Sequence, residues 1–336
     1  MFAILKVMRK FFSFLVHALA LSFTALFLSW MFDGSFYSYQ FTRAQGLDSP
    51  PIKENHIDIP LAFPNFGSFI KGTNILLLGM AGKPYPAPEL TDTIMIASFE
   101  GDPLRLTLTS IPRDLLVSVG AQKRMVKINS LYELGLTFSP LLPTAFIVEK
   151  VEEITGRHID YFVGIDVLGL EQIIDRMGGV DIEVKKDIAD PFFPGPNYSY
   201  EPLYIKKGFG HFSGHDAVRL VRSRYSVRGD FDRIERQHDL LEAIRIRAKD
   251  TLKNPNALLD IFSGLKEYFS TNVTLKDIPL FLGALLSGHI PIEATTIDPG
   301  QSGLLSEIHT QGGMYGLIPK AGIDDYSEIQ NFFQRL

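Results

Sequence analysis

Residues 74–79 read NILLLG, a continuous apolar run that ends at a glycine. Such a run is typical of a strand whose two faces are both covered by other parts of the protein. Two more strands are predicted at 93–99 and 104–111, and the second of these alternates between apolar and polar residues. Gly101 to Pro103 supply the turn between them, so we expect these two strands to pair as an antiparallel hairpin.

Helices and strands then alternate along the chain. Helices are predicted over 142–155, where Gly156 ends the pattern, and over 167–177. Strands are predicted at 158–166 and 180–184. This alternation, together with the hairpin, predicts an α/β fold: a three-layer α-β-α sandwich with a mixed central sheet.

The second half of the chain adds helices to the same domain. Ser213 is a suitable N-cap for a helix over 214–222, and Asp230 or Asp232 for a long helix that runs to about Lys249. No linker follows, so the tail is expected to complete the domain. Its predicted elements are a helix near 257–269, a strand near 292–297 and a final helix from about Tyr326 to Arg335.

The N-terminus predicts a membrane anchor. Residues 11–32 contain no Asp, Glu, Lys or Arg, and a helix of this length spans the hydrocarbon core of a bilayer, which is ~30 Å thick. Three cations lie among residues 1–10, so the positive-inside rule places that tail in the cytoplasm and the rest of the chain outside. Residues 33–72, which are interrupted by prolines, are predicted to be a linker. A signal peptide cleaved near residues 18–20 is the alternative interpretation.

Composition narrows the class of protein. The chain has 336 residues, which is enough for one large domain or two small ones with a sizeable core. A net charge of −5 argues against a nucleic-acid-binding protein, which is usually basic. There is no cysteine, which excludes disulfides, a thiolate metal site and a cysteine nucleophile.

Residues 221–237 (VRSRYSVRGDFDRIERQ) contain five arginines, interleaved with acids and broken by one glycine. A guanidinium group keeps its charge at physiological pH and presents a planar fork of donors to phosphate. Gathered on a turn and at the start of a helix, such arginines form a site for a phosphate group. A solvated helix face with salt bridges is the alternative interpretation.

The long helix contains an irregularity. At 100° per residue, Arg233 and Gln237 lie at the edge of the apolar stripe that Leu240, Leu241 and Ile244 form. Burying an arginine without a partner is costly, so an inward-facing site for an anion would explain this placement. An arginine that extends along the domain edge to water is the alternative.

Polar residues also gather at the predicted strand ends. Asp92 enters the second strand, and Arg113 and Asp114 follow the third strand after a proline. Open α/β sheets bind ligands at the carboxyl edge. An aspartate there is able to hold Mg²⁺, which prefers oxygen ligands, or simply to cap a turn. Lys127 adds another cation.

Together these pieces resemble the LytR–CpsA–Psr family. The resemblance implies an α/β sandwich outside the membrane behind one N-terminal anchor. The implied domain covers 73–336, in which 74–249 form the family core and 250–336 complete the fold. Each motif alone is weak, but the ordered set is specific. The matching motifs, in family order, are NILLLG (74–79), LTDTI (90–94), SIPRD (110–114), KIN (127–129), GGVDIEV (178–184), the segment 208–217, VRSR (221–224) and DFDRIERQ (230–237).

The resemblance also implies an activity: transfer of a glycopolymer from an undecaprenyl-pyrophosphate carrier to the cell wall, usually to a peptidoglycan hydroxyl. By this resemblance Asp92 would hold Mg²⁺. The expected catalytic residues are Asp92, Arg113, Arg224 and Arg233. The residues expected to bind the pyrophosphate are Arg113, Lys127, Arg222, Arg224, Arg233, Arg236 and Gln237.

Two positions depart from the family pattern. Ala81 stands where members commonly have an Asp, which removes one expected magnesium ligand and puts metal use in doubt. Leu90 stands where members commonly have an Arg, which removes one phosphate contact. Glu89 and Lys83 are the candidates to compensate.

Other functions are compatible with parts of this pattern. Water in place of the acceptor hydroxyl would make the protein a pyrophosphate hydrolase. A non-enzymatic regulator that binds polyprenyl phosphates would fit the loss of the acid at Ala81. A DNA-binding regulator is a further alternative, against which the predicted topology argues. Asp92 and Asp114 are the candidates for a general base.

Overall fold

The protein is described by a computed structural model, and the described residues are 70–195, 199–223, 225–226, 229–251, 265–274, 277, 290–310 and 313–336. The predicted anchor at 11–32 lies outside them, as does all but the last three residues of the predicted linker. Within the part of the chain that the structure describes, no helix is long and apolar enough to cross a membrane.

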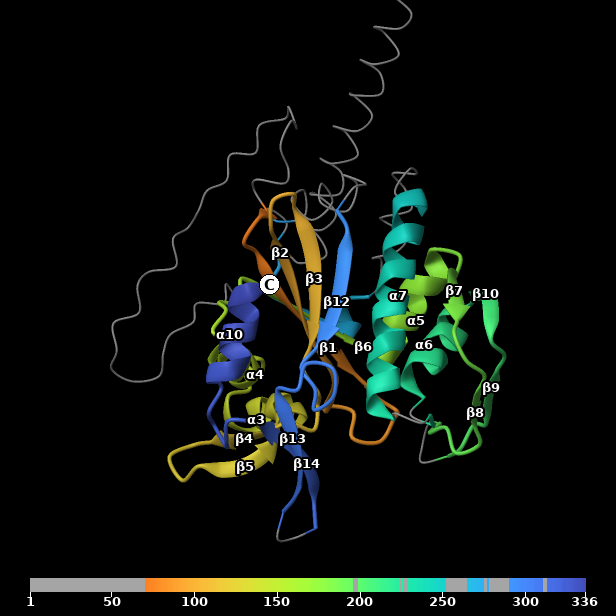
Figure 1. The fold of residues 1–336 in the computed structure, drawn as a ribbon. Helices are drawn as coiled ribbons and strands as arrows, with labels where there is room; N and C mark the ends of the chain where they lie inside the picture. Colours follow the sequence, from red (N-terminus) through yellow and green to blue (C-terminus); the bar gives the residue numbers. More distant parts are fainter. Residues whose placement is uncertain are drawn as a thin grey trace, which may run out of the picture.

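A six-stranded sheet forms the centre of the molecule, in the order β11-β6-β1-β2-β3-β12 (Figure 1). Four strands run parallel, whereas β2 and β11 run antiparallel to them, so the sheet is mixed. The predicted hairpin is confirmed, because β2 and β3 pair with Ala97 opposite Leu108. The strands are β1 (Asn74–Met80), β2 (Thr91–Glu100), β3 (Arg105–Ser110), β6 (Tyr161–Asp166), β11 (Phe269–Thr271) and β12 (Ile292–Thr296).

Helices cover both faces of this sheet (Figure 1). One face carries α3 (Leu131–Phe138), α4 (Ala145–Thr155) and α10 (Ser327–Arg335). On the other side lie α5 (Val167–Arg176), α6 (Gly214–Arg222) and α7 (Asp230–Thr251). The mixed α/β fold is therefore as predicted.

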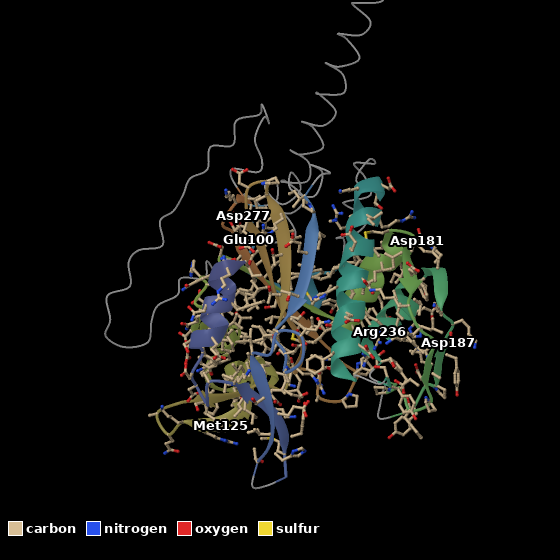
Figure 2. All side chains as sticks on the ribbon, in the orientation of Figure 1. Glu100, Met125, Asp181, Asp187, Arg236 and Asp277 are labelled. Carbon is tan, nitrogen blue, oxygen red and sulfur yellow. The ribbon has the colours of Figure 1, made fainter. Side chains whose placement is uncertain are left out.

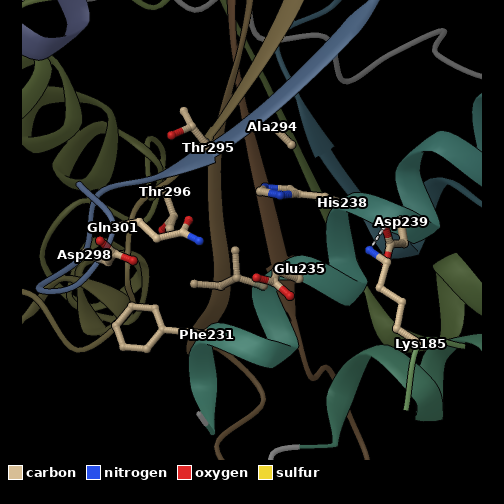
Figure 3. A pocket seen from close by; sticks show the side chains of 11 residues that line it. Lys185, Phe231, Glu235, His238, Asp239, Ala294, Thr295, Thr296, Asp298 and Gln301 are labelled. Carbon is tan, nitrogen blue, oxygen red and sulfur yellow. Dashed lines mark hydrogen bonds and ion pairs between the residues drawn. The ribbon is translucent and has the colours of Figure 1, made fainter.

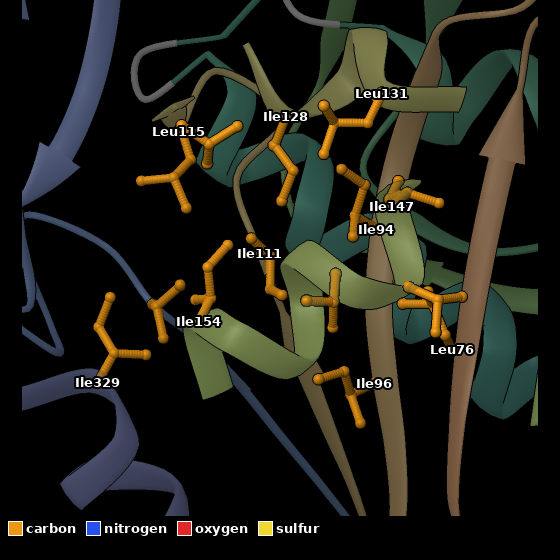
Figure 4. Close-up of a cluster of buried hydrophobic side chains, with 14 of the residues drawn as sticks. Leu76, Ile94, Ile96, Ile111, Leu115, Ile128, Leu131, Ile147, Ile154 and Ile329 are labelled. Carbon is orange, nitrogen blue, oxygen red and sulfur yellow. The ribbon is translucent and has the colours of Figure 1, made fainter. Parts of the chain in front are cut away.

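Strand β2 shows why both faces are covered. Ile94 and Ile96 point into the core cluster beneath α4 and α10, whereas Met95 and Ala97 pack on the opposite face with Leu241 of α7. Successive side chains of a strand point to opposite faces, so a continuous apolar run requires cover on both. Figure 4 shows the α4 and α10 side of this core.

Local signals place the helix ends. The predicted stop at Gly156 is confirmed: this residue is the C-cap of α4 and has a φ of 67°, a left-handed conformation that favours glycine. Ser213 caps α6 as predicted, because its hydroxyl accepts a hydrogen bond from the Asp216 N–H at 3.2 Å. The Asp166 carboxylate, at the end of β6, accepts from the Gly169 N–H at 2.8 Å and caps α5.

Four two-stranded sheets lie outside the central one. The predicted strand at 180–184 is confirmed as β7, but it pairs with β10 rather than with the central sheet. The pairs are β4 (Leu116–Val119) with β5 (Arg124–Lys127), β7 (Val180–Val184) with β10 (Gly208–Phe212), β8 (Ile188–Asp190) with β9 (Leu203–Ile205), and β13 (Leu305–His309) with β14 (Tyr315–Pro319).

The predicted helix near 257–269 falls partly outside the described residues, and its end is wrong. Lys266–Tyr268 form a short 3-10 turn and Phe269 begins β11. This strand pairs with Val163–Ile165 of β6. Pairing with a distant strand overrides the local preference, and a short sequence window does not contain that information.

Candidate functional site

The predicted polar residues meet at one edge of the sheet. The carboxyl ends of β1, β3, β6 and β12 share this edge, and the antiparallel β2 begins there. The backbone N–H of Ile111 donates to the Ile94 carbonyl at 2.9 Å, so the chain continues to pair just beyond β3. This pairing holds the segment that contains Asp92 beside the segment that contains Arg113.

Asp92 and Arg113 form an ion pair at this edge. The Nη1 of Arg113 donates to the Asp92 carboxylate at 2.6 Å. The Nε of the same guanidinium lies 3.7 Å from the Asp114 carboxylate, which in turn accepts from the Lys127 ammonium at 2.6 Å. The motifs LTDTI, SIPRD and KIN are thus joined in a row of alternating charges.

Arg233 completes this cluster from α7. Its side chain is buried, with 2% of the residue exposed, and its Nη2 donates to the backbone carbonyl of Asp92 at 2.9 Å. The alternative in which this arginine extends to water is therefore wrong. The N-terminal end of α7 also lies here, and the helix dipole adds positive potential at that end. Two guanidinium groups and a helix terminus therefore converge on Asp92.

Arg222 lies in the last turn of α6. Its guanidinium lies over the Tyr85 ring at 4.2 Å and near the Phe193 ring at 5.4 Å, which is cation–π geometry. Tyr85 belongs to the loop that joins β1 to Asp92 at the start of β2. The sequence did not predict either aromatic partner, because neither lies near Arg222 in the chain.

Arg236 is placed differently from the other predicted ligands. Its Nε donates to the Leu220 carbonyl at 2.9 Å, and its Nη2 donates to the Ser223 carbonyl, so it satisfies the last carbonyls of α6. Figure 2 shows it on the side of α7 toward α6. Burial lowers the pKa of this guanidinium. Gln237 is half-buried one turn after Arg233, and Arg224 lies outside the described residues.

His238 belongs to this region and was not predicted. Its Nε2 lies 2.8 Å from the Ser110 hydroxyl at the end of β3. Burial lowers the pKa of His238 to about 4, so the ring is neutral at physiological pH. A single histidine on a long helix carries no sequence signal of its own, so only the fold reveals this contact.

Two features of the described residues bear on the expected magnesium site. Ala81 is buried in an apolar cluster with Tyr85 and Val167, so this position offers no ligand. The Asp92 carboxylate is bonded to Arg113, a cation that competes with a metal for it. Among the residues that the structure describes, no group of three His, Cys, Asp or Glu is arranged to hold a metal ion.

Glu89, a candidate to compensate for Ala81, acts on a neighbouring region. Burial raises the pKa of the Asp166 carboxyl at the end of β6, and the charges of Glu267 and Glu89 contribute to the rise. Burial likewise raises the pKa of Tyr132, again with a contribution from Glu89. The negative charge of Glu89 thus contributes to the raised pKa values of groups at the end of β6 and in α3.

Known proteins resemble this chain in sequence. One relative is the probable cell wall biosynthesis protein LcpB of Corynebacterium glutamicum, 34% identical over 51% of this chain and 36% of LcpB. Another is the polyisoprenyl-teichoic acid–peptidoglycan teichoic acid transferase TagU of Bacillus cereus, 26% identical over 60% of each chain. The chain thus spans less than two thirds of the length of these relatives.

The fold also has a solved counterpart. The crystal structure of B. subtilis TagV superimposes with a TM-score of 0.60 at 25% identity, covering 79% of this chain and 97% of that one. The sequence model of the LytR_cpsA_psr family matches residues 51–315. This match includes Asp92, Arg113 and Arg233, the residues that meet at the sheet edge. Since the match extends over most of the sequence, the chain belongs to the LytR_cpsA_psr family.

Proposed function

We propose that this protein transfers a glycopolymer from a polyprenyl-pyrophosphate carrier to a hydroxyl of the cell wall, with peptidoglycan as the acceptor. The observation that carries the proposal is the burial of Arg233 against Asp92, beside the Asp92–Arg113 ion pair. An inward-facing guanidinium at a sheet edge is suited to a phosphate ligand. The activity after which the relative TagU is named is of the same kind.

The reaction is a phosphoryl transfer. The acceptor hydroxyl oxygen attacks the phosphorus that carries the sugar and forms a new P–O bond. The bond from this phosphorus to the bridging oxygen breaks, and the bridging oxygen leaves with the lipid as polyprenyl monophosphate. The acceptor proton passes to a base, and the glycan becomes linked to the wall through a phosphodiester.

The arginines supply the main catalytic effect. Charge spreads over the phosphoryl oxygens and accumulates on the bridging oxygen in the transition state, and preorganised cations stabilise it. Arg113 and Arg233 face the pyrophosphate from the sheet edge and from α7, and Arg222 approaches from α6. Such donors are effective because the fold holds them in place before substrate arrives.

Asp92 is the better placed of the two candidate bases. Its side chain is 33% exposed, whereas that of Asp114 is 13% exposed and lies beside Lys127. An incoming hydroxyl therefore reaches the Asp92 carboxylate more readily. When phosphate oxygens compete for Arg113, the carboxylate is released to accept the proton.

Magnesium has no step in this proposal. Ala81 offers no ligand and Arg113 competes for the Asp92 carboxylate, so we assign the charge of the pyrophosphate to the guanidinium groups. We expect transfer to continue in the presence of EDTA, within about a factor of three, because cationic side chains perform the neutralisation. Loss of transfer on chelation, restored by Mg²⁺, would contradict this part of the proposal.

We further propose that residues 11–32 anchor the protein in the cell membrane, with the N-terminus in the cytoplasm and the folded domain outside. The 22-residue uncharged segment and the preceding cations support this orientation. We expect protease to degrade the domain when it is added to protoplasts, which have an intact membrane but no wall. Protection of the domain in such cells, with digestion only after lysis, would contradict this orientation.

Product analysis tests the activity. Full-length protein in detergent is incubated with a radiolabelled polyprenyl-pyrophosphate glycan and peptidoglycan. We expect label in the insoluble wall fraction together with free polyprenyl monophosphate. Soluble phosphorylated glycan would instead indicate the hydrolase, and binding without any product would indicate the non-enzymatic regulator. The variant Arg335→Ala, at the exposed end of α10, serves as a control for loss of a surface arginine.

A further inference from the structure

A cavity of about 170 Å³ lies between α7 and β12, next to the arginine cluster (Figure 3). Its walls come from α7, from β12 and from the loop that follows β12. The residues that matter for its chemistry are Phe231, Glu235, His238, Thr296, Asp298 and Gln301.

The cavity and the proposed reaction centre share α7 and the end of β3. Phe231 and Glu235 lie two residues to either side of Arg233 on α7. His238 reaches the Ser110 hydroxyl at the end of β3, three residues before Arg113. The cavity thus shares α7 with Arg233, on a different side of the helix, and borders the end of β3 that leads to Arg113.

The charges of the cavity oppose a second phosphate. The lining includes the carboxylates of Glu235, Asp239 and Asp298. The ammonium of Lys185, which also lines the cavity, already bridges both Asp239 oxygens at 3.0 and 2.9 Å. The carboxylates would therefore repel a phosphate, and the one ammonium group in the lining is already engaged by Asp239.

The polar lining also opposes a prenyl chain. Burying hydrocarbon against carboxylates, a hydroxyl and an amide would desolvate polar groups without giving them new partners. A ligand rich in hydroxyl groups fits better, because hydroxyls donate to carboxylates and exchange hydrogen bonds with Thr296 and Gln301. The ring of Phe231 offers an apolar face at the side of the cavity (Figure 3).

We propose that this cavity binds a sugar ring, either of the donor glycan or of the acceptor strand, and so aligns it with the pyrophosphate. The inference rests on the proposed glycopolymer transfer. Part of the cavity is held rigid in advance: the Asp298 carboxylate accepts from the Ser302 N–H at 2.7 Å and from the Ser302 hydroxyl at 3.2 Å. The Thr296 hydroxyl is fixed in the same way, because it donates a hydrogen bond to the Ser110 carbonyl at 3.3 Å.

A second cavity of about the same volume continues from the first. Lys185, Glu235 and Asp239 line both cavities, so these side chains form the boundary between them at α7. Two adjoining cavities of this size match consecutive units of a linear polymer. A saccharide chain that crosses α7 would therefore occupy both.

Binding by full-length protein in detergent tests the proposal. Three probes are used: peptidoglycan disaccharide, polyprenyl pyrophosphate, and polyprenyl pyrophosphate bearing one N-acetylhexosamine. The variants are Gln301→Ala and Glu235→Gln, which change one cavity side chain each. Matched controls are Gln122→Ala on the β4–β5 turn and Glu328→Gln on α10, both at exposed positions.

We expect each cavity variant to weaken binding of one sugar-bearing probe about fivefold to tenfold, the effect of one or two lost hydrogen bonds. Binding of the sugar-free carrier should stay unchanged. Weaker binding of the disaccharide identifies the acceptor as occupant, and weaker binding of the sugar-bearing carrier identifies the donor. The controls should bind all three probes like the wild type.

Equal binding of every sugar-bearing probe by wild type and cavity variants would overturn the proposal. The result is separable from the fate of the proposed function, because binding is measured without turnover. If transfer is absent but the cavity variants still lose sugar affinity, the saccharide site stands and the transferase reaction falls. If transfer occurs and sugar affinity is unaffected, the reaction stands and this site falls.

Discussion

Arg233 has almost no contact with solvent, and its guanidinium is held by the carbonyl of Asp92. Replacing it with alanine removes a buried donor and leaves a gap in the wall of the site. We expect Arg233→Ala to reduce transfer at least about 100-fold, because a preorganised donor to the transition state is lost. Arg233→Lys should restore only part of the rate, since an ammonium lacks the planar fork.

The measurement is the initial rate of polyprenyl monophosphate release, with thermal unfolding recorded for each variant. A folded Arg233→Ala protein that transfers glycan at the wild-type rate would remove this residue from the mechanism. Arg335→Ala, which changes an exposed arginine, should leave both quantities unchanged.

Asp92 is expected to act in the chemical step. Asp92→Asn keeps the shape of the side chain but removes the proton acceptor, so we expect kcat to fall about 100-fold or more. The KM for the carrier should change little, because the arginines bind the pyrophosphate. A fall in carrier affinity with kcat preserved would assign Asp92 to positioning of Arg113 instead.

His238 makes stability depend on pH. Its pKa is lowered to about 4 by burial, below the ordinary value of 6.5, so the unfolded chain takes up a proton first as pH falls. Stability is therefore full above pH 6.5 and declines between pH 6.5 and 4, by at most about 3 kcal/mol. His238→Gln keeps a partner for Ser110 and does not titrate. Unfolding curves from pH 7 to 4 should show a steeper loss for the wild type, and parallel curves would contradict this assignment.

At the level of single residues, the sequence predicts much of the cluster but not its contacts. Asp92 and Arg113 could be placed because strand ends of one sheet gather at one edge, whereas Lys127 ends β5 of a separate two-stranded sheet. Arg236 shows the limit of that reasoning: a charge on a helix does not reveal whether it faces a ligand or a neighbouring helix end. The stacking of Arg222 on Tyr85 and Phe193 depends on loops whose paths only the fold determines.

At the level of elements, α6 positions Arg222 through its close packing on α5. Gly214 begins α6, and a Cβ atom there would lie 2.1 Å from the Glu171 carbonyl oxygen of α5. The Glu171 backbone cannot move away without a shift of α5, so we expect Gly214→Ala to lower the free energy of unfolding by about 2 kcal/mol or more. Transfer should fall as well, because α6 must shift. Chemical unfolding provides the test.

Gly300→Ala is the matched control for this change, because the nearest atom to its added Cβ is 3.9 Å away. Its unfolding midpoint should stay near that of the wild type. Equal stability of the two variants would show that α5 and α6 separate without cost, contrary to our account.

The elements that the sequence predicts best are those with unbroken apolar patterns. The strand at 74–79 and the hairpin after it belong to this group, since burial on both faces leaves a continuous signal. The short strands β4, β5, β8 and β9 were not predicted, because three or four residues of hairpin carry little periodicity. Strand β11 depends on pairing with β6, to which nothing in its own residues points.

At the scale of the whole molecule, two polar regions of different charge are kept apart. The guanidinium groups lie at the carboxyl edge of the sheet, where they attract phosphate, and the acidic cavity lies beside them on α7, where hydroxyl groups fit. A phosphate and its attached sugar require these opposite environments next to each other. The sheet edge and the first turns of α7 provide both.

The most direct test compares the affinities of full-length wild type and of the double variant Arg113→Ala/Arg233→Ala for polyprenyl pyrophosphate and polyprenyl monophosphate. We predict that the wild type prefers the pyrophosphate by about tenfold or more, since a second phosphate adds charge-assisted hydrogen bonds. The double variant should lose this preference while it remains folded. A folded double variant that keeps the full preference would contradict the central claim that these arginines form the pyrophosphate site.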